Sequence, residues 1–208
     1  MDPTRVGDAS FATSEWGGAP DLPRLLARLL GTVGPLLGAA ACSVALTEGA
    51  RTLRFVAATG AGAADIVGQT MPTDRGVAGW AVTTGQAISV GDVESDARFH
   101  RDLAESTGYV PQHITAVPIM NEDTTVGVLE VLDGDRTLLT SAAGTAALHG
   151  MVATAADLIG SLGQTSASSA QRATVDALVR LDDADPDLVE HLNEVIQALA
   201  GGRGGHRR

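Results

Sequence analysis

The segment 74–131 constrains the fold more than any other part of this chain, because its elements follow one another in a fixed order. A glycine-opened stretch at 76–84 has helical spacing, and the apolar residues at 87–90 predict a strand after it. An irregular acidic stretch follows. Alternating residues at 114–120 and 126–132 then predict two neighbouring strands joined by a polar turn. This order predicts a sheet that carries helices in its connections.

The flanking residues extend the pattern to a whole domain. Thr140 or Ser141 is placed to cap a long helix, and the glycine- and alanine-rich stretch 60–71 is predicted to be an irregular connection. The other predicted elements are helices at 21–33, 96–106 and 140–162 and strands at 42–46 and 53–59. Helices with one apolar stripe and strands with alternating apolar and polar residues, in this order, predict the α+β class, with helices packed around a single sheet.

The ends of the chain differ from the domain in composition. The predicted divisions are a flexible N-terminal arm at 1–19, a domain at 20–163, a linker at 164–169, a helical hairpin at 170–200 and a disordered basic tail at 201–208. A hairpin this small cannot bury its apolar faces alone. It is expected to pack on the domain, on its copy in a dimer or on a partner protein.

Composition excludes several classes of function. The formal net charge is −11 and aromatic residues make up 3% of the chain, so nucleic-acid binding is disfavoured. Lysine is absent, which excludes a Walker-type phosphate loop and a Schiff-base lysine. A secretory signal and an uninterrupted apolar span of eighteen residues are both lacking in the sequence, which predicts a cytoplasmic protein without membrane contact.

The central motifs resemble those of the GAF domain family. They are the V-x-D-V-x-x-D-x-R-F stretch at 90–99, the Val-Pro-Ile strand at 117–119 and the Val-Gly-Val-Leu-Glu-Val strand at 126–131. The resemblance covers 21–163 and implies a small-molecule-binding, dimerising module of signalling proteins. It further implies a central antiparallel sheet whose first and last long helices lie on one face. These helices would also build a homodimer, unless both of their apolar sides are used within the monomer.

Family members with more specific activities carry features that this sequence lacks. The segment 132–140 has none of the Asn, Lys, Phe and Asp-Glu residues of the cyclic-nucleotide signature, so no cyclic nucleotide is expected. Methionine-sulfoxide reductases of this fold need several cysteines to resolve a sulfenic acid, whereas Cys42 is the only cysteine here. Neither a haem-ligand motif nor a hydrolase motif is present. We therefore expect no enzyme activity and no cofactor.

Eight residues are candidates for binding a ligand. Seven of them lie on elements that are expected to face a family-type pocket, and the eighth, Asp92, follows the third predicted strand of the domain. Trp80 could instead be a core anchor. Asp92 and Asp96 could instead cap a turn and the next helix. The candidates are Phe55, Trp80, Asp92, Phe99, Tyr109, Ile114, Val117 and Glu130.

The function expected from these features is that of a non-catalytic, dimeric sensory or regulatory protein. It would bind an unknown small molecule or a protein partner, and would signal through its C-terminal helices. One alternative is a purely structural interaction module whose pocket is filled by core side chains. Another is an undetected enzyme, whose turnover would be lost on changing Asp92 or His100.

Overall fold

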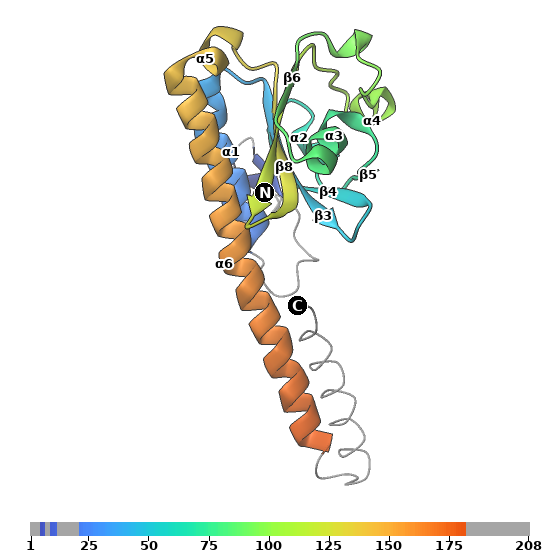
Figure 1. Ribbon diagram of the computed structural model, residues 1–208, viewed down its shortest axis with the longest axis vertical. Coiled ribbons are helices and arrows are strands. Elements are labelled where there is room, and N and C mark those ends of the chain that lie inside the picture. Colours follow the sequence, from blue (N-terminus) through green and yellow to red (C-terminus); the bar gives the residue numbers. More distant parts are fainter. Residues whose placement is uncertain (1–4, 7–8, 12–20, 182–208) are drawn as a thin grey trace, which may run out of the picture. The chain divides into compact units, whose positions relative to one another are not determined.

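The computed structural model describes residues 5–6, 9–11 and 21–181, and side chains are described from 22 to 161 (Figure 1). The chain divides into two units, Met1–Gly163 and Gln164–Arg208. The first unit is α+β, as predicted, and it holds the sheet and the candidate site.

An antiparallel sheet forms the centre of this unit. Its strands run in the order β1-β2-β4-β3-β8-β7-β6, and β5 pairs separately with β4. The strands are β1 (Arg5–Val6), β2 (Ala9–Phe11), β3 (Ala41–Glu48), β4 (Thr52–Gly60), β5 (Thr70–Pro72), β6 (Ile88–Val90), β7 (Ile114–Asn121) and β8 (Thr124–Leu132). Strands β1 and β2 lie within the segment 1–19, for which a flexible arm is expected, and β2 extends the sheet by pairing with β4.

The helices lie on both faces of this sheet. They are α1 (Asp21–Val33), α2 (Ala63–Ile66), α3 (Gly76–Thr84), α4 (Arg101–Ser106), α5 (Arg136–Thr140) and α6 (Ala142–Leu181), with single 3-10 turns at Gly34–Leu37 and Val93–Ser95. As predicted, α1 and the start of α6 share one face (Figure 1). The short helices α2, α3 and α4 cover the other face.

The core on the helix face is aliphatic. Leu26 and Leu30 of α1 and Met151 and Ala155 of α6 are almost completely buried against the sheet. Because side chains alternate along a strand, Leu129 of β8 belongs to this core while its neighbours face the opposite side. The wide apolar stripes seen in the sequence are thus used, in large part, within one subunit.

Two connections differ from the predictions, and a third agrees with them. The predicted helix at 96–106 begins only at Arg101, since the Asp96 carboxylate accepts from the Arg98 backbone N–H at 2.9 Å and holds a separate turn. The stretch 60–71, predicted to be irregular, contains α2 and the start of β5. Ser141 caps α6 as one of the two predicted candidates, accepting from the Gly144 N–H at 3.0 Å.

Helix α6 is longer than predicted. Residues 164–169 were predicted to be a linker, but they are helical, and α6 is unbroken from Ala142 to Leu181. This stretch contains neither glycine nor proline, so nothing in it stops a helix that already has tertiary support. The predicted second helix of the hairpin and the basic tail lie outside the described residues.

Within the described part, one stretch of α6, Ala142–Ser161, has the length and composition that could cross a membrane. Leu148, Met151 and Ile159 of this stretch pack on the sheet, as in the core helix of a globular domain. The helix is therefore weak evidence for a membrane span.

Candidate functional site

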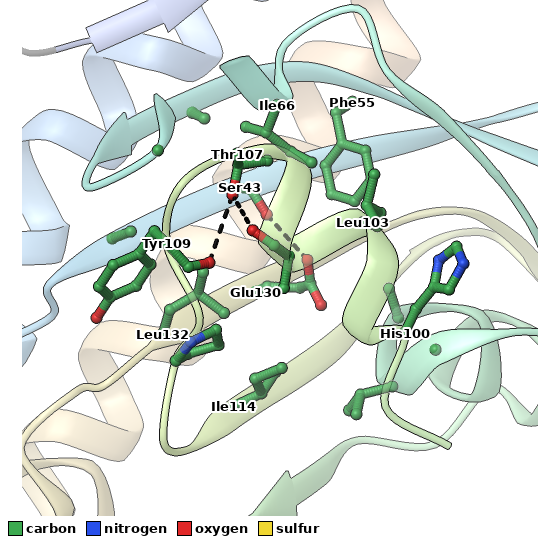
Figure 2. A pocket seen from close by; sticks show the side chains of 18 of the residues that line it. Ser43, Phe55, Ile66, His100, Leu103, Thr107, Tyr109, Ile114, Glu130 and Leu132 are labelled. Atoms are coloured by element: carbon green, nitrogen blue, oxygen red, sulfur yellow. Dashed lines mark hydrogen bonds between the residues drawn. The ribbon is translucent and has the colours of Figure 1, made fainter. Parts of the chain in front are cut away.

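A cavity of about 80 Å³ lies on the face of the sheet opposite α1 and α6. Its floor is formed by β3, β4, β7 and β8, and its cover by α2, α3, α4 and the residues that follow α4. The lining is mostly apolar, and Phe55, Ile66, Leu103 and Ile114 supply its large side chains (Figure 2).

Glu130 is a charged residue in this apolar lining. It lies on β8, is 8% exposed, and accepts a hydrogen bond from the Ser43 hydroxyl at 3.0 Å (Figure 2). Burial penalises the ionised form and raises the pKa of the Glu130 carboxyl to about 7, although the Ser43 hydrogen bond acts in the opposite direction. The cavity therefore contains an acid that changes charge near neutral pH.

The segment after α4 is pinned to the end of β8. The Tyr109 hydroxyl donates to the Asp133 carboxylate, which also accepts from the backbone N–H groups of Gln112 and His113 at 2.8 and 2.9 Å. Burial and Asp133 together raise the pKa of Tyr109 above its ordinary value. The Tyr109 hydroxyl is therefore engaged in a structural hydrogen bond, and Tyr109 contributes its apolar part to the cavity lining.

A second depression, a groove of about 540 Å³, lies beside α3. The Arg98 guanidinium lies 5.3 Å from the centroid of the Trp80 ring and pairs with Asp96 at 2.5 Å. The hydrogen bond from the Arg98 side chain holds the pKa of Asp96 at about 2. His100 lines both the groove and the cavity, and its Nδ1 is buried without a hydrogen-bond partner among the described residues.

The predicted site residues separate into two groups. Phe55, Phe99, Tyr109, Ile114 and Glu130 all line the cavity, so the structure brings these five together.

The other three candidates lie elsewhere. Val117 faces the α1 and α6 side, because Ile114 and Ala116 occupy the cavity side of β7 and side chains alternate. Trp80 is half-buried and lines the groove instead of the cavity, so neither of its two interpretations holds fully. Asp92 is exposed and lines neither depression, and its side chain does not cap the turn that follows it.

Sequence reasoning missed several lining residues, including Ser43, Met71, Leu103 and Thr107. Ser43 is the most important of these, because it is the register partner of Glu130 across β3 and β8. A strand register between residues 87 positions apart leaves no local signal in the sequence.

The single cysteine lies on the helix side of the sheet. Cys42 is 1% exposed, and its Sγ lies 3.1 Å from where a Cβ on Gly34 would be. Burial raises the pKa of its thiol to about 12, so it stays protonated near neutral pH. Within residues 22–161, no three His, Cys, Asp or Glu side chains are grouped so as to hold a metal ion.

Comparison with known proteins agrees with the fold. The family model described as "GAF domain" matches residues 19–159. A probable 3',5'-cyclic phosphodiesterase pde-5 of Caenorhabditis elegans is 29% identical over 59 residues, which are 28% of this chain and 8% of that protein. The chain therefore spans only a small part of this curated relative.

Two solved structures share the fold at low identity. Residues 122 to 287 of a methyl-accepting chemotaxis protein superpose with a TM-score of 0.60 at 20% identity, covering 70% of this chain and 92% of that one. A type II free methionine-R-sulfoxide reductase from Thermoplasma acidophilum has a TM-score of 0.51 at 16% identity, covering 67% and 95%. At these identities the likeness describes the fold alone.

Proposed function

Because the chain belongs to the GAF domain family, we propose that it is a non-catalytic sensory or regulatory protein that binds a small molecule in the cavity between the sheet and α2–α4. The observation that carries this proposal is the Glu130 carboxylate, which lies in an apolar cavity and has one hydrogen bond from a described residue. A ligand would supply the contacts that the protein leaves unmade.

The same observation argues against a pocket filled by core side chains. Burying a carboxylate costs free energy unless it is paired or fully hydrogen-bonded. A cavity with only a packing role would be more stable with an apolar side chain in place of Glu130. The presence of Glu130 beside the cavity therefore favours a ligand-binding protein over the purely structural interaction module.

A regulatory function is also better supported than an enzymatic one. The reductase neighbour shares the fold, but the thiol of Cys42 lies on the opposite side of the sheet from Glu130, and its raised pKa disfavours the reactive thiolate. The alternative of an enzyme using Asp92 or His100 gains little support, because Asp92 lines neither depression while His100 lines both, so the two residues share no site.

The proposal includes a homodimer and an output through the C-terminal helices. Leu29 and Val33 of α1 and Val152 and Leu158 of α6 are only partly buried against the core, so their free surfaces can meet a second copy of the chain. The helix α6 begins within the domain and continues to Leu181, which supports it as the route to a protein partner.

Native mass spectrometry of gently purified full-length protein tests ligand binding. An adduct is expected on the wild-type protein and should be lost in Ala78→Leu, which fills the cavity from α3. Ala153→Leu, on the exposed side of α6, is the matched control and should keep the adduct. If no adduct is found and dissolved xenon also fails to enter the wild-type cavity, the filled-pocket module replaces this proposal.

A further inference from the structure

The cavity carries one strongly polar feature, and its chemistry limits the ligand. Glu130 reaches the cavity from β8, and the apolar side chains of Phe55, Leu103 and Ile114 line the same cavity (Figure 2). One of its oxygens is bonded to Ser43, and the other points away from Ser43. Resting on the proposed function, we infer that the ligand is a small primary ammonium compound whose charged nitrogen binds Glu130 and whose apolar tail fills the cavity.

The charge of the lining selects a cation. Arginine is absent from the residues that line the cavity, and lysine is absent from the whole chain. His100 is the one described lining residue that can carry a positive charge, so an anionic ligand would meet Glu130 with no permanently charged cation to compensate. An ammonium group instead forms a charge-assisted hydrogen bond to the free carboxylate oxygen. It also relieves the cost of burying the ionised acid, which the raised pKa of Glu130 reflects.

The size of the cavity limits the rest of the molecule. An engineered apolar cavity of roughly 150 Å³ holds benzene, so the 80 Å³ here suits a ligand of roughly four heavy atoms. The aliphatic and aromatic lining favours an alkyl tail without further polar groups. Propylamine has this composition and is the probe of choice.

The titratable neighbours of Glu130 set the controls for pH. His100 and Tyr109 also line the cavity, and the raised pKa of Tyr109 keeps it protonated between pH 5.5 and 8. The Cys42 side chain belongs to the core on the other face of the sheet, and its raised pKa keeps it protonated over the same range. The charged side chains on the covering helices are exposed and line no part of the cavity; these are Asp65, Arg101, Asp102 and Glu105. His100→Gln therefore separates the contribution of His100 from that of Glu130.

The test compares propylamine, propanol and propionate by NMR titration of the full-length, isotope-labelled protein. Propylamine should bind at pH 8 with a Kd on the order of 1 mM, which suits a ligand of this size. At pH 5.5 a proton competes for Glu130, and binding should weaken roughly 30-fold. Glu130→Gln should abolish the preference for the amine over propanol at both pH values, whereas Asp102→Asn, which removes an exposed carboxylate on α4, should keep it. The pH dependence that remains in His100→Gln is that of Glu130.

Other results have distinct meanings. If propanol binds as tightly as propylamine at pH 8, or propylamine binds more tightly at pH 5.5, the ammonium assignment is wrong while the cavity still binds ligands. If propionate binds best, the assignment is likewise wrong. If none of the three binds and xenon is also excluded, the proposed function fails together with this inference.

Discussion

Ser43 and Glu130 are register partners on β3 and β8, and the Ser43 hydroxyl donates to the Glu130 carboxylate at 3.0 Å. The bond links two central strands on the cavity side of the sheet. It also gives the buried acid a donor that does not titrate. The donor to Glu130 is therefore the same group whether the carboxyl is charged or neutral.

The first prediction concerns the pH dependence of stability. The pKa of Glu130 is about 7 in the folded state, compared with 4.5 for an ordinary glutamate, so the folded state binds an extra proton between these values. The free energy of unfolding should fall as the pH rises from 4.5 to 7, by about 3 kcal/mol in total, and level off above. Urea unfolding of Glu130→Gln at several pH values should lack this decline.

The control for this experiment is Glu122→Gln. Glu122 is exposed in the turn between β7 and β8, so its replacement should leave the decline unchanged. A wild-type stability that stays flat between pH 5 and 7 would show that Glu130 is not buried in the way described.

Ser43→Ala tests the hydrogen bond directly. At pH 8 the ionised Glu130 would lose its donor, and the free energy of unfolding should drop by about 2 kcal/mol. At pH 5 the neutral carboxyl needs this donor less, so the loss should be smaller. The variant should also raise the pKa of Glu130 further, since the Ser43 bond lowers it.

The matched control is Ser89→Ala. The Ser89 hydroxyl is also on a strand and bonds the Thr115 hydroxyl at 3.0 Å, but this pair is exposed. Its removal should have little effect and no pH dependence. Equal losses for the two serine variants at both pH values would remove the case for a special Ser43–Glu130 bond.

Two glycine-to-alanine changes in helices should have opposite signs. A Cβ on Gly79 of α3 would lie 2.7 Å from the Thr73 carbonyl oxygen, so Gly79→Ala should destabilise the domain by about 2 kcal/mol. A Cβ on Gly150 of α6 would meet nothing within 4 Å, and Gly150→Ala should stabilise by up to about 1 kcal/mol. Urea midpoints measure both, and a stabilising Gly79→Ala would mean that α3 is not packed this closely.

The proposed dimer can be tested by sedimentation equilibrium. Wild-type protein should be dimeric at micromolar concentration, and Leu29→Arg on α1 should make it monomeric. Leu138→Arg places the same change at a leucine on α5 that is 41% exposed, and should leave the dimer intact. A monomeric wild-type protein at high concentration would refute the dimer.

Regular elements could be predicted because their patterns are local. The α1 stripe, the α3 helix with its two glycines and the paired strands β7 and β8 all stand where periodicity placed them. The face of each side chain was harder, since one residue of register decides it. Val117, predicted to line the cavity, lies on the helix face, whereas Glu130 lines the cavity.

Features that depend on distant residues could not be predicted. The start of α4 depends on the Asp96–Arg98 turn, and the helical state of 164–169 depends on a helix that begins far upstream. The cavity itself combines strands and helices from separate parts of the chain. Ser43 belongs to the site only because β3 pairs with β8 in this register. A single serine in an apolar strand does not indicate that role in the sequence.

Because the Cys42 thiol is buried, its chemical labelling reports local opening of the domain. A thiol reagent cannot reach the side chain while β3 stays covered by α1, and the raised pKa suppresses the thiolate in the closed state. Because the chain has a single thiol, the rate of labelling measures how often α1 and β3 separate enough to expose it. Each variant above, and each ligand that binds in the cavity, can therefore be ranked without denaturant by the rate at which the Cys42 thiol is labelled.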